Sequence, residues 1–474
     1  MRGFRSRPAG GVQPLIPMTE FTLNRRAFLK TSLAAAAYFS LPRVSIAQAG
    51  PPPSRRVNLA FVGVGGIGGS ALSGCEGENY VAFCDVDDAR AAANYAKYPD
   101  VPRFRDFRVM LEKLGPQIDA VVVSTPDHTH FAAAYVAMEM GKHVYVQKPL
   151  THDIWQARTL QRAAHRFKVV TQMGNQGHAG EGIRLIKEWY EAGVLGEVRE
   201  VHAWLSGPGF ADAKYFRIPP QFPPANIPVP ATLDWELWLG PARKRPFTAE
   251  YAPLFWRSWW DFGTSILGDW ACHTLDAPFW ALGLGMPTRI SVVNLEPIAP
   301  GFSHRTSHLK FEFPARGEQP PVTLHWYDGG QKPPMPLDWD RSKPWPNGGM
   351  IMVGNRRTLM TGARPDSPTL LLPPAEWDEF RRNLPAKTIP RVKGGPFQEW
   401  LRAIKGEGPA PGSNFDYSAR LTEVSLLGVI AQRSQRDIAW DDAGMRITNH
   451  RDLDHLVREQ PRRGWRYGEA AWRS

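Results

Sequence analysis

The sequence predicts an α/β fold in which an N-terminal, doubly wound parallel sheet precedes a C-terminal α+β domain with an open, largely antiparallel sheet. From residue 57 to residue 175, short β-branched runs alternate with helical stretches, which is typical of βαβ units. Beyond residue 175, strand-like segments alternate apolar with polar residues, as strands with one solvated face do. All eighteen tryptophans lie after residue 150. These changes in pattern place a domain boundary near residue 175.

Five buried strands are expected in the first domain, which spans residues 57–175. They are Val57–Val62, Tyr80–Cys84, Ala120–Ser124, His143–Gln147 and Val169–Met173. Helices are expected between them over residues 66–74, 88–98, 106–114, 128–140 and 154–167. Because crossover helices cover both faces of a parallel sheet, these strands are expected in its interior.

The second domain is expected over residues 176–474. Its clearest strands are Arg199–Leu205, Ile290–Leu295, Leu309–Phe313 and Val322–Tyr327, and two late helices cover Phe397–Lys405 and Tyr417–Ser434. Residues 50–56 contain three consecutive prolines and are predicted to be a linker.

The composition is that of a globular protein, with 43% hydrophobic and 22% charged residues. The net charge is +11, but residues 1–50 hold seven basic residues and one acidic residue and so account for +6 of it. The remaining excess is spread along the chain without a Lys/Arg block. This distribution favours a solvated surface over a nucleic-acid interface.

Residues 1–49 are predicted to be a twin-arginine signal peptide. Arg25 and Arg26 precede the alanine-rich apolar run Thr31–Leu41, and Ala47–Ala49 is an A-x-A cleavage site. A membrane span needs about 20 apolar residues, so no stable span is expected. The predicted location is therefore the periplasm or the outside of the cell, with the twin-arginine translocase as a partner. The alternative is an Arg-rich amphipathic helix, and a start at Met18 would leave residues 1–17 untranslated.

The three cysteines, Cys75, Cys84 and Cys272, are too few for a disulfide framework and lack metal-ligand spacing. A protein exported after folding forms its structure in the reducing cytosol, where disulfides are rare. The cysteine content is consistent with that route.

A glycine-rich turn follows the first strand and precedes a helix. It contains Gly63, Gly65, Gly66, Ile67 and Gly68 in a G-x-G-x-x-G arrangement. In this context the glycines let a pyrophosphate approach the helix N-terminus, which identifies a dinucleotide-binding Rossmann domain.

Asp85 ends the next strand, about 20 residues after the glycines. A carboxylate at this position hydrogen-bonds the adenosine ribose and repels a 2′-phosphate. We therefore expect NAD as the cofactor rather than NADP.

Three further segments occur in an order that resembles the glucose–fructose oxidoreductase, inositol dehydrogenase and MocA (Gfo/Idh/MocA) family. They are Ser124–His130, the pair Lys148-Pro149 after a strand, and Gly268–Asp276 with its Asp-x-x-x-His pattern. The resemblance covers residues 56–450 and includes the closing segment Pro396–Gly406. It implies an oxidoreductase acting on a small carbohydrate, and a homo-oligomer assembled through the open sheet face.

The resemblance implies three catalytic residues, Lys148, Asp269 and His273. Oxidation of an alcohol requires removal of the hydroxyl proton as hydride leaves carbon. A histidine suits the proton transfer, and a lysine can orient the oxygen and stabilise developing charge. The i,i+4 spacing places Asp269 and His273 on one helix face. Gln147 stands where the family usually has glutamate, which removes a negative charge beside the lysine.

The remaining candidates surround these three residues. Thr125, Pro126, Asp127 and His130, together with Gln147 and Lys148, are expected to form the nicotinamide side of the cofactor site. Asn175 and His178, which follow the last parallel strand, and Arg257 in the aromatic run 256–262 are expected to contact substrate. The His128-x-His130 pair lacks a third ligand nearby, so no metal is expected. The aromatic run either stacks on sugar or belongs to the core.

The leading hypothesis is an NAD-linked oxidoreductase of a sugar, sugar acid or polyol. An exported enzyme has no supply of free NAD, which favours a tightly bound, self-regenerating cofactor. The alternative is a glycoside hydrolase that oxidises the sugar, eliminates the glycosidic group, adds water and reduces the product again. A non-enzymatic sugar-binding protein fits the retained Lys148, Asp269 and His273 less well.

Overall fold

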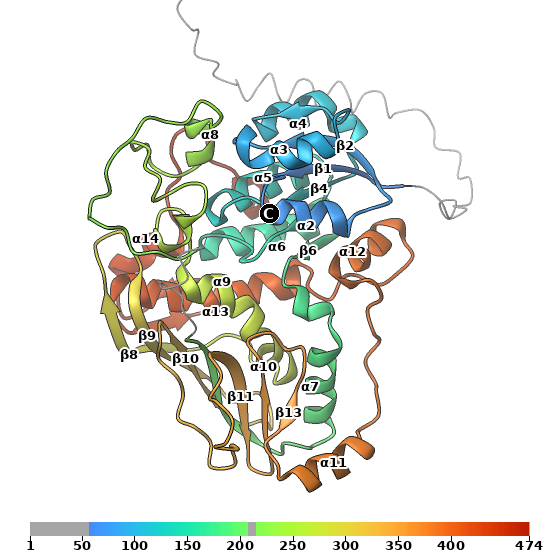
Figure 1. The fold of residues 1–474 in the computed structure, drawn as a ribbon, viewed down its shortest axis with the longest axis vertical. Helices are drawn as coiled ribbons and strands as arrows, with labels where there is room; N and C mark the ends of the chain where they lie inside the picture. Colours follow the sequence, from blue (N-terminus) through green and yellow to red (C-terminus); the bar gives the residue numbers. More distant parts are fainter. Residues whose placement is uncertain (1–55, 207–214, 474) are drawn as a thin grey trace, which may run out of the picture. The chain divides into compact units, whose positions relative to one another are not determined.

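The computed structural model describes residues 56–206 and 215–473 (Figure 1). The predicted signal peptide and all but the last residue of the predicted linker lie outside the described residues. The described residues all belong to one compact unit.

The N-terminal part contains a six-stranded, wholly parallel sheet in the order β3-β2-β1-β4-β5-β6. Its strands are β1 (Asn58–Val62), β2 (Asn79–Cys84), β3 (Arg103–Phe104), β4 (Ala120–Val123), β5 (His143–Val146) and β6 (Thr171–Met173). The central strands β1 and β4 are almost fully buried because helices cover both faces. The prediction of a doubly wound parallel sheet is confirmed. The two-residue strand β3 was missed, because so short a strand has no periodicity.

The helices between these strands match the expected segments. They are α2 (Ile67–Gly74), α3 (Asp88–Lys97), α4 (Phe107–Leu114), α5 (Asp127–Glu139) and α6 (Ile154–Phe167). Three of them begin at aspartates, Asp87, Asp106 and Asp153, whose side chains accept hydrogen bonds from amides of the first turn. These caps fix where each helix leaves the sheet edge.

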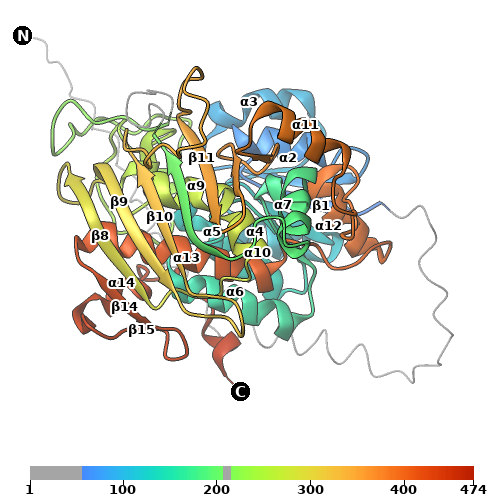
Figure 2. The same cartoon turned by 90° about the horizontal axis from the view of Figure 1, so that it is seen from below.

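The C-terminal part is built on a nine-stranded sheet in the order β13-β12-β11-β7-β10-β9-β8-β14-β15. Every neighbouring pair is antiparallel except β7 and β10. The long strands lie side by side in Figure 2: β7 (Val198–Leu205), β8 (Arg289–Pro297), β9 (His304–Phe313), β10 (Val322–Asp328) and β11 (Gly348–Gly354). The shorter strands are β12 (Thr358–Thr361), β13 (Thr369–Leu370), β14 (Ile438–Asp441) and β15 (Arg446–Ile447). The largely antiparallel α+β prediction is confirmed.

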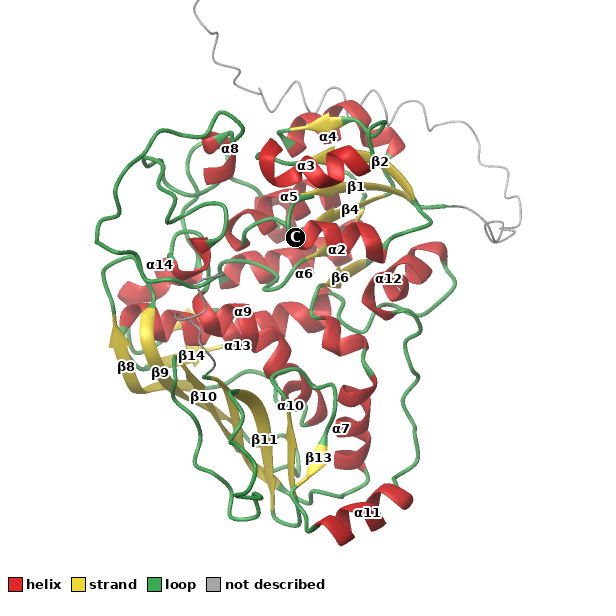
Figure 3. Ribbon diagram, in the orientation of Figure 1, coloured by secondary structure: helices red, strands yellow, loops and turns green. Residues whose placement is uncertain are grey.

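The remaining helices belong to this part of the chain (Figure 3). They are α7 (Glu181–Glu191), α8 (Trp235–Leu239), α9 (Ser265–Thr274), α10 (Asp276–Ala281), α11 (Pro374–Arg382), α12 (Gly395–Lys405), α13 (Phe415–Ser434) and α14 (Asp454–Val457). Helices α9 and α13 pack against each other and against the nine-stranded sheet, and α13 also packs against α6. Helix α9 therefore lies between the sheet and the site described below.

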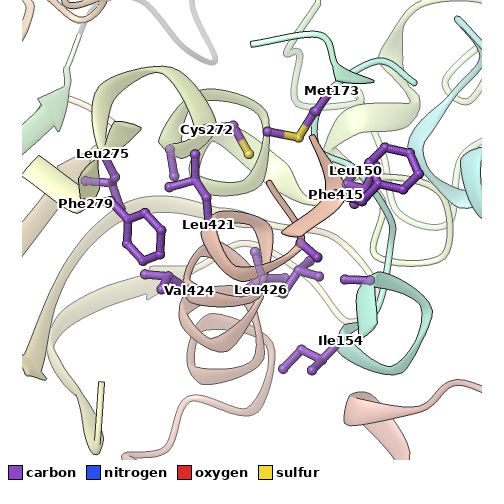
Figure 4. Packing of buried hydrophobic residues seen from close by; sticks show 14 of the residues in the cluster. Leu150, Ile154, Met173, Cys272, Leu275, Phe279, Phe415, Leu421, Val424 and Leu426 are labelled. Atoms are coloured by element: carbon purple, nitrogen blue, oxygen red, sulfur yellow. The ribbon is translucent and has the colours of Figure 1, made fainter. Parts of the chain in front are cut away.

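One apolar core joins the two parts around α13. Figure 4 shows Leu421, Val424 and Leu426 of α13 among side chains from both parts, including Ile154 of α6 and Cys272 of α9. Helix α13 is buried on nearly every side. The three cysteines are free and buried.

Helix α12, although late in the chain, packs on the N-terminal sheet. The ring of Phe397 stacks on Tyr145 of β5 with centroids 4.1 Å apart, and Trp400 and Leu401 are buried in the same apolar cluster as β1 and β4. The sequence predicted this helix but not its place, because periodicity does not identify a packing partner.

In the two described stretches, no helix has both the length and the apolar character that a membrane span requires.

Candidate active site

A cavity of about 860 Å³ extends from the glycine-rich turn to α9. It lies at the carboxyl ends of the parallel strands, where doubly wound sheets bind ligands. Its walls include the turn after β1, the ends of β4 and β5, the segment around Arg257, and α9. The predicted residues that line it are Gly63, Gly65, Gly66, Ile67, Asp85, Thr125, Pro126, Asp127, Gln147, Lys148, Arg257, Asp269 and His273.

The glycines of the turn serve two purposes. Gly63 and Gly66 have positive φ values of 82° and 55°, and a Cβ on Gly65 would lie 2.8 Å from the Arg90 carbonyl oxygen. These three line the cavity. Gly68 does not, and a Cβ there would lie 2.2 Å from the Gly63 carbonyl oxygen. Gly68 therefore lets α2 approach the turn and does not itself face a ligand.

Asp85 lies under the turn at the end of β2. Its Oδ2 accepts hydrogen bonds from the amides of Val64 and Gly65, at 2.9 and 3.1 Å. Burial raises the pKa of this carboxyl, although the backbone amides that donate to it act in the opposite direction. The carboxylate thus fixes the turn and also lines the cavity.

Polar groups of the cavity that lack hydrogen-bond partners are suited to bind a dinucleotide. Helix α2 begins at Gly66 without a side-chain cap, and Gly66 and Ile67 at its N-terminus line the cavity. The amides of Gly68 and Gly69 donate to the Gly65 and Gly66 carbonyl oxygens, so it is the positive end of the helix dipole that favours a pyrophosphate here. The hydroxyls of Ser124 and Thr125, at the end of β4, are buried and have no hydrogen-bond partner among the described residues. Because both residues also line the cavity, these two hydroxyls are free to hydrogen-bond a bound dinucleotide.

Most of the residues predicted for the nicotinamide side line the cavity, and their contact with a nicotinamide stays a prediction. Thr125, Pro126 and Asp127 line the cavity, and the Gln147 side chain lies over Gly174, where an added Cβ would be 2.7 Å from Oε1. His130 was also predicted to be part of this wall, but it does not line the cavity, so that prediction is corrected.

Both ring nitrogens of His130 contact backbone carbonyls. Nε2 lies 2.8 Å from the Thr125 oxygen and Nδ1 lies 2.9 Å from the Pro149 oxygen. The His130 ring therefore connects the segments that follow β4 and β5. Its neighbour in the His-x-His pair, His128, also contacts backbone carbonyls, and the described residues contain no cluster suited to a metal ion.

Lys148 and Asp269 form an ion pair across the cavity. The Lys148 Nζ donates to Oδ1 of Asp269 at 2.6 Å and to its backbone oxygen at 2.7 Å. Arg257 Nε lies 3.5 Å from the same Oδ1. Burial by itself would raise the pKa of Asp269, but the charges of Lys148 and Arg257 outweigh it and lower the pKa to about 2. Asp269 is therefore ionised at neutral pH.

His273 lies one helical turn beyond Asp269 on α9 and is buried. Burial and the positive charges of Lys148 and Arg364 lower its pKa well below the ordinary value, against the opposing effect of Asp269. Its Nδ1 has no hydrogen-bond partner among the described residues. The site thus holds a neutral imidazole that can accept a proton.

Asn175 and His178 do not line the cavity, so their predicted role as substrate contacts is corrected. Both bind the buried carboxylate of Asp276: Asn175 Nδ2 lies 3.0 Å from Oδ2, and His178 Nδ1 lies 2.9 Å from Oδ1. The Tyr417 hydroxyl donates to the same Oδ1 at 2.6 Å. The polar turn after β6 therefore joins the two parts of the molecule. The sequence identified the turn but not its partner 98 residues away.

The lining residues that were not predicted include Gln176, Trp270 and Arg364. Gln176 and Trp270 adjoin predicted residues in the chain, and that proximity was the only signal for them. Arg364 follows β12 in a segment with no motif.

The aromatic segments are divided between core and cavity. One apolar cluster contains Trp235, Trp238, Trp256, Trp259 and Phe262. Of these five, Trp238 and Trp256 also line the cavity. Only part of this aromatic set is therefore placed to face a ligand.

Comparison with known families identifies both parts of the chain. Residues 57–175 match the NAD-binding Rossmann-fold model of an oxidoreductase family, and residues 180–296 match the C-terminal alpha/beta domain model of the same family. The N-terminal domain is therefore an NAD-binding domain.

Curated relatives include a dehydrogenase and a hydrolase. The chain is 32% identical to inositol 2-dehydrogenase 1 of Saccharopolyspora erythraea over 154 residues, which are 31% of this chain and 44% of that protein. It is 29% identical to a glycosyl hydrolase family 109 protein of Solibacter usitatus over 196 residues, 37% of this chain and 44% of that protein. The chain spans about half the length of the curated relatives it matches.

Among solved structures, the WlbA dehydrogenase of Chromobacterium violaceum, crystallised with NADH and UDP-GlcNAcA, superimposes with a TM-score of 0.58. The match covers 84% of this chain and 99% of that one at 16% identity. At this identity the likeness establishes the common fold.

Proposed function

Because the chain carries the NAD-binding and C-terminal domains of the Gfo/Idh/MocA family, we propose that it is an NAD-dependent oxidoreductase acting on a hydroxyl of a sugar, sugar acid or polyol. The observation that carries the proposal is the position of the Lys148–Asp269 ion pair and the neutral His273. They line the same cavity as the glycine turn of the NAD-binding domain.

The three residues have distinct roles in this proposal. NAD, when bound, supplies the hydride acceptor. His273 takes the proton from the substrate hydroxyl, because it lines the cavity and its imidazole is neutral. Lys148 provides a positive charge beside the oxygen as that proton leaves. Asp269 is already ionised and held by Lys148, so it positions the lysine and does not exchange a proton.

The cofactor chemistry allows a second outcome with the same residues. After oxidation next to the leaving position, elimination of the glycosidic group, addition of water and re-reduction would give hydrolysis without net redox change. The matched relatives named as family 109 glycosyl hydrolases support keeping this alternative. A tightly bound NAD suits it, because the hydride then returns to the substrate.

Export also favours a retained cofactor. We propose that residues 1–49 direct the folded protein through the twin-arginine translocase, on the basis of Arg25, Arg26 and the Ala47–Ala49 site. Replacement of Arg25 and Arg26 by lysines should leave the protein in the cytoplasm, as measured by cell fractionation. Unchanged export would refute this route.

The family resemblance further supports a homo-oligomer. Light scattering of the purified protein tests it, since a mass of one chain would exclude a stable oligomer.

The proposed activity is tested on the purified full chain. Any bound nucleotide is released and identified, and a panel of polyols, free sugars and glycosides is assayed for product and for NADH. Net NADH with a polyol or sugar supports the dehydrogenase, and glycoside cleavage without net NADH supports the hydrolase. Lys148→Ala should abolish either activity, whereas Lys113→Ala, which changes an exposed lysine of α4, should not. Absence of nucleotide together with an unaffected Lys148→Ala protein would refute both readings.

A further inference from the structure

The substrate end of the cavity contains more positive than negative charge. Lys148, Arg257 and Arg364 all line it, whereas the ionised carboxylate among them is Asp269. The other carboxyl nearby is Asp127, whose pKa is raised by burial and whose Oδ2 accepts a hydrogen bond from Thr264 at 2.8 Å. The cations therefore exceed the anions available to them.

Arg257 shares the carboxylate of Asp269 with Lys148. Its Nε lies 3.5 Å from Asp269 Oδ1, which already accepts the shorter bond from Lys148 Nζ at 2.6 Å. The guanidinium is held between two aromatic rings, with its Cζ 4.2 Å from the centroid of Trp256 and 4.9 Å from that of Tyr215. These rings orient the guanidinium without neutralising it.

Arg364 has no carboxylate partner among residues 56–206 and 215–473. Its Cζ lies 5.7 Å from the ring centroid of Trp270, the residue next to Asp269 on α9. Its charge also contributes to the low pKa of His273, so it lies near the proton acceptor. Arg257 and Arg364 thus approach consecutive residues of α9 from different segments of the chain.

Guanidinium groups pair with carboxylate and phosphate through two parallel hydrogen bonds, which a neutral hydroxyl cannot match. A charged group that loses water without gaining a counter-charge is destabilised. A neutral polyol in this cavity would cover the largely buried Arg257 without supplying the charge that it shares with Lys148. An anionic sugar would supply that charge and could also pair with the solvent-exposed Arg364 at the cavity wall.

We propose that Arg257 and Arg364 bind a negatively charged group of the substrate, a carboxylate or a phosphate, and that the substrate is therefore an acidic sugar. This inference rests on the proposed function, whose substrate class it narrows.

The test compares matched sugars on the NAD-loaded protein. D-glucose, D-glucuronate and D-glucose 6-phosphate are compared in two measurements, binding by calorimetry and turnover by product analysis. The expected result is that one of the two acidic sugars binds and reacts about 10- to 100-fold better than glucose. Preference for glucuronate identifies a carboxylate, and preference for the phosphate identifies a phosphoryl group.

Variants test whether Arg257 and Arg364, and not the positive charge of the protein in general, give the preference for acidic sugars. Arg364→Gln and Arg257→Gln should each reduce the acidic-to-neutral ratio by about 10-fold or more. Arg357→Gln is the matched control, because Arg357 lies near Arg364 in the chain and contacts the Phe380 ring but does not line the cavity. It should keep the ratio of the wild type.

Certain outcomes would refute the acidic-sugar inference, the oxidoreductase function, or both. If glucose binds and reacts at least as well as both acidic sugars, or if Arg364→Gln keeps the wild-type ratio, the inference is wrong while the oxidoreductase function stands. If an acidic sugar binds through the arginines but NAD neither changes nor is required, the function is wrong while the binding site stands. If no sugar of either charge binds, both are refuted.

Discussion

At the scale of single residues, the charges around His273 govern its readiness to accept a proton. Lys148 and Arg364 oppose protonation of the imidazole, and Asp269 favours it. Because burial acts in the same direction as the two cations, His273 is neutral well below neutral pH. Each neighbour therefore leaves a separate signature in the pH dependence of catalysis.

The first prediction concerns the acid limb of kcat/KM, which reports the free enzyme's base. In the wild type, activity should be retained below pH 6.5, because the pKa of His273 is lowered and kcat/KM falls only when the imidazole is protonated. Lys148→Met removes a cation and should move the limb to higher pH. Asp269→Asn removes an anion and should move it to lower pH.

Both variants should also lower kcat by about 100-fold or more, since the charge beside the substrate oxygen is lost in one and misplaced in the other. Thermal melting of each variant serves as the control for folding. A limb that stays in place in both variants would refute the role of His273 as the base.

At the scale of elements, the approach of α2 to the glycine turn is a steric requirement. The second prediction is that Gly68→Ala lowers NAD affinity at least about 10-fold, because its methyl group would lie 2.2 Å from the Gly63 carbonyl oxygen and displace the turn. Gly69→Ala on the same helix is the control, because its methyl would meet Asn94 Nδ2 at a tolerable 3.4 Å. Calorimetric titration with NAD measures both, and equal affinities would contradict the assigned role of Gly68.

The third prediction concerns α12, which completes the core of the N-terminal sheet. Trp400 is fully buried there, so Trp400→Ala should lower the free energy of unfolding by about 3–5 kcal/mol. Leu337→Ala is the control, since Leu337 is 90% exposed. Urea unfolding compares the two, and a Trp400 variant as stable as the control would mean that α12 does not support this core.

The elements also show which features of the fold and the site could be predicted from the sequence and which could not. The helices of the N-terminal sheet, its strands other than β3 and its glycine turn follow from periodicity and spacing, which are local. The set Lys148, Asp269 and His273 was implied by the resemblance to a known family. The misplaced residues, His130, Asn175 and His178, are polar side chains near the right strand ends whose partners lie elsewhere in the chain. Arg364 went unnoticed because only tertiary structure brings it to the cavity.

At the scale of the whole molecule, the free energy of unfolding should depend on pH through histidines whose pKa is lowered in the folded protein. His202, His308 and His325 lie on β7, β9 and β10, with His308 Nε2 3.0 Å from His325 Nδ1. Burial and the neighbouring imidazoles lower the pKa of His308 to about 4, and burial lowers the pKa of the other two.

The fourth prediction follows from the sign of these shifts. Between pH 6.5 and about 4 the unfolded chain binds more protons at these histidines than the folded protein does, so the free energy of unfolding falls as the pH is lowered through this range. His308→Gln should reduce that pH dependence. Urea midpoints measured at several pH values provide the test, and an identical slope in the variant would contradict the assignment.

The central claim for the molecule as a whole is that a sugar hydroxyl is oxidised at the cavity shared by the NAD-binding domain and α9. The most direct measurement is the oxidation state of the nicotinamide during the first turnover, followed by rapid mixing of the NAD-loaded protein with its sugar. Reduced nicotinamide should form in the wild type, whether it then accumulates or is consumed, and it should form at least about 100-fold more slowly in Lys148→Met. Product formation while the nicotinamide stays oxidised throughout, or equal rates in the two proteins, would contradict the central claim.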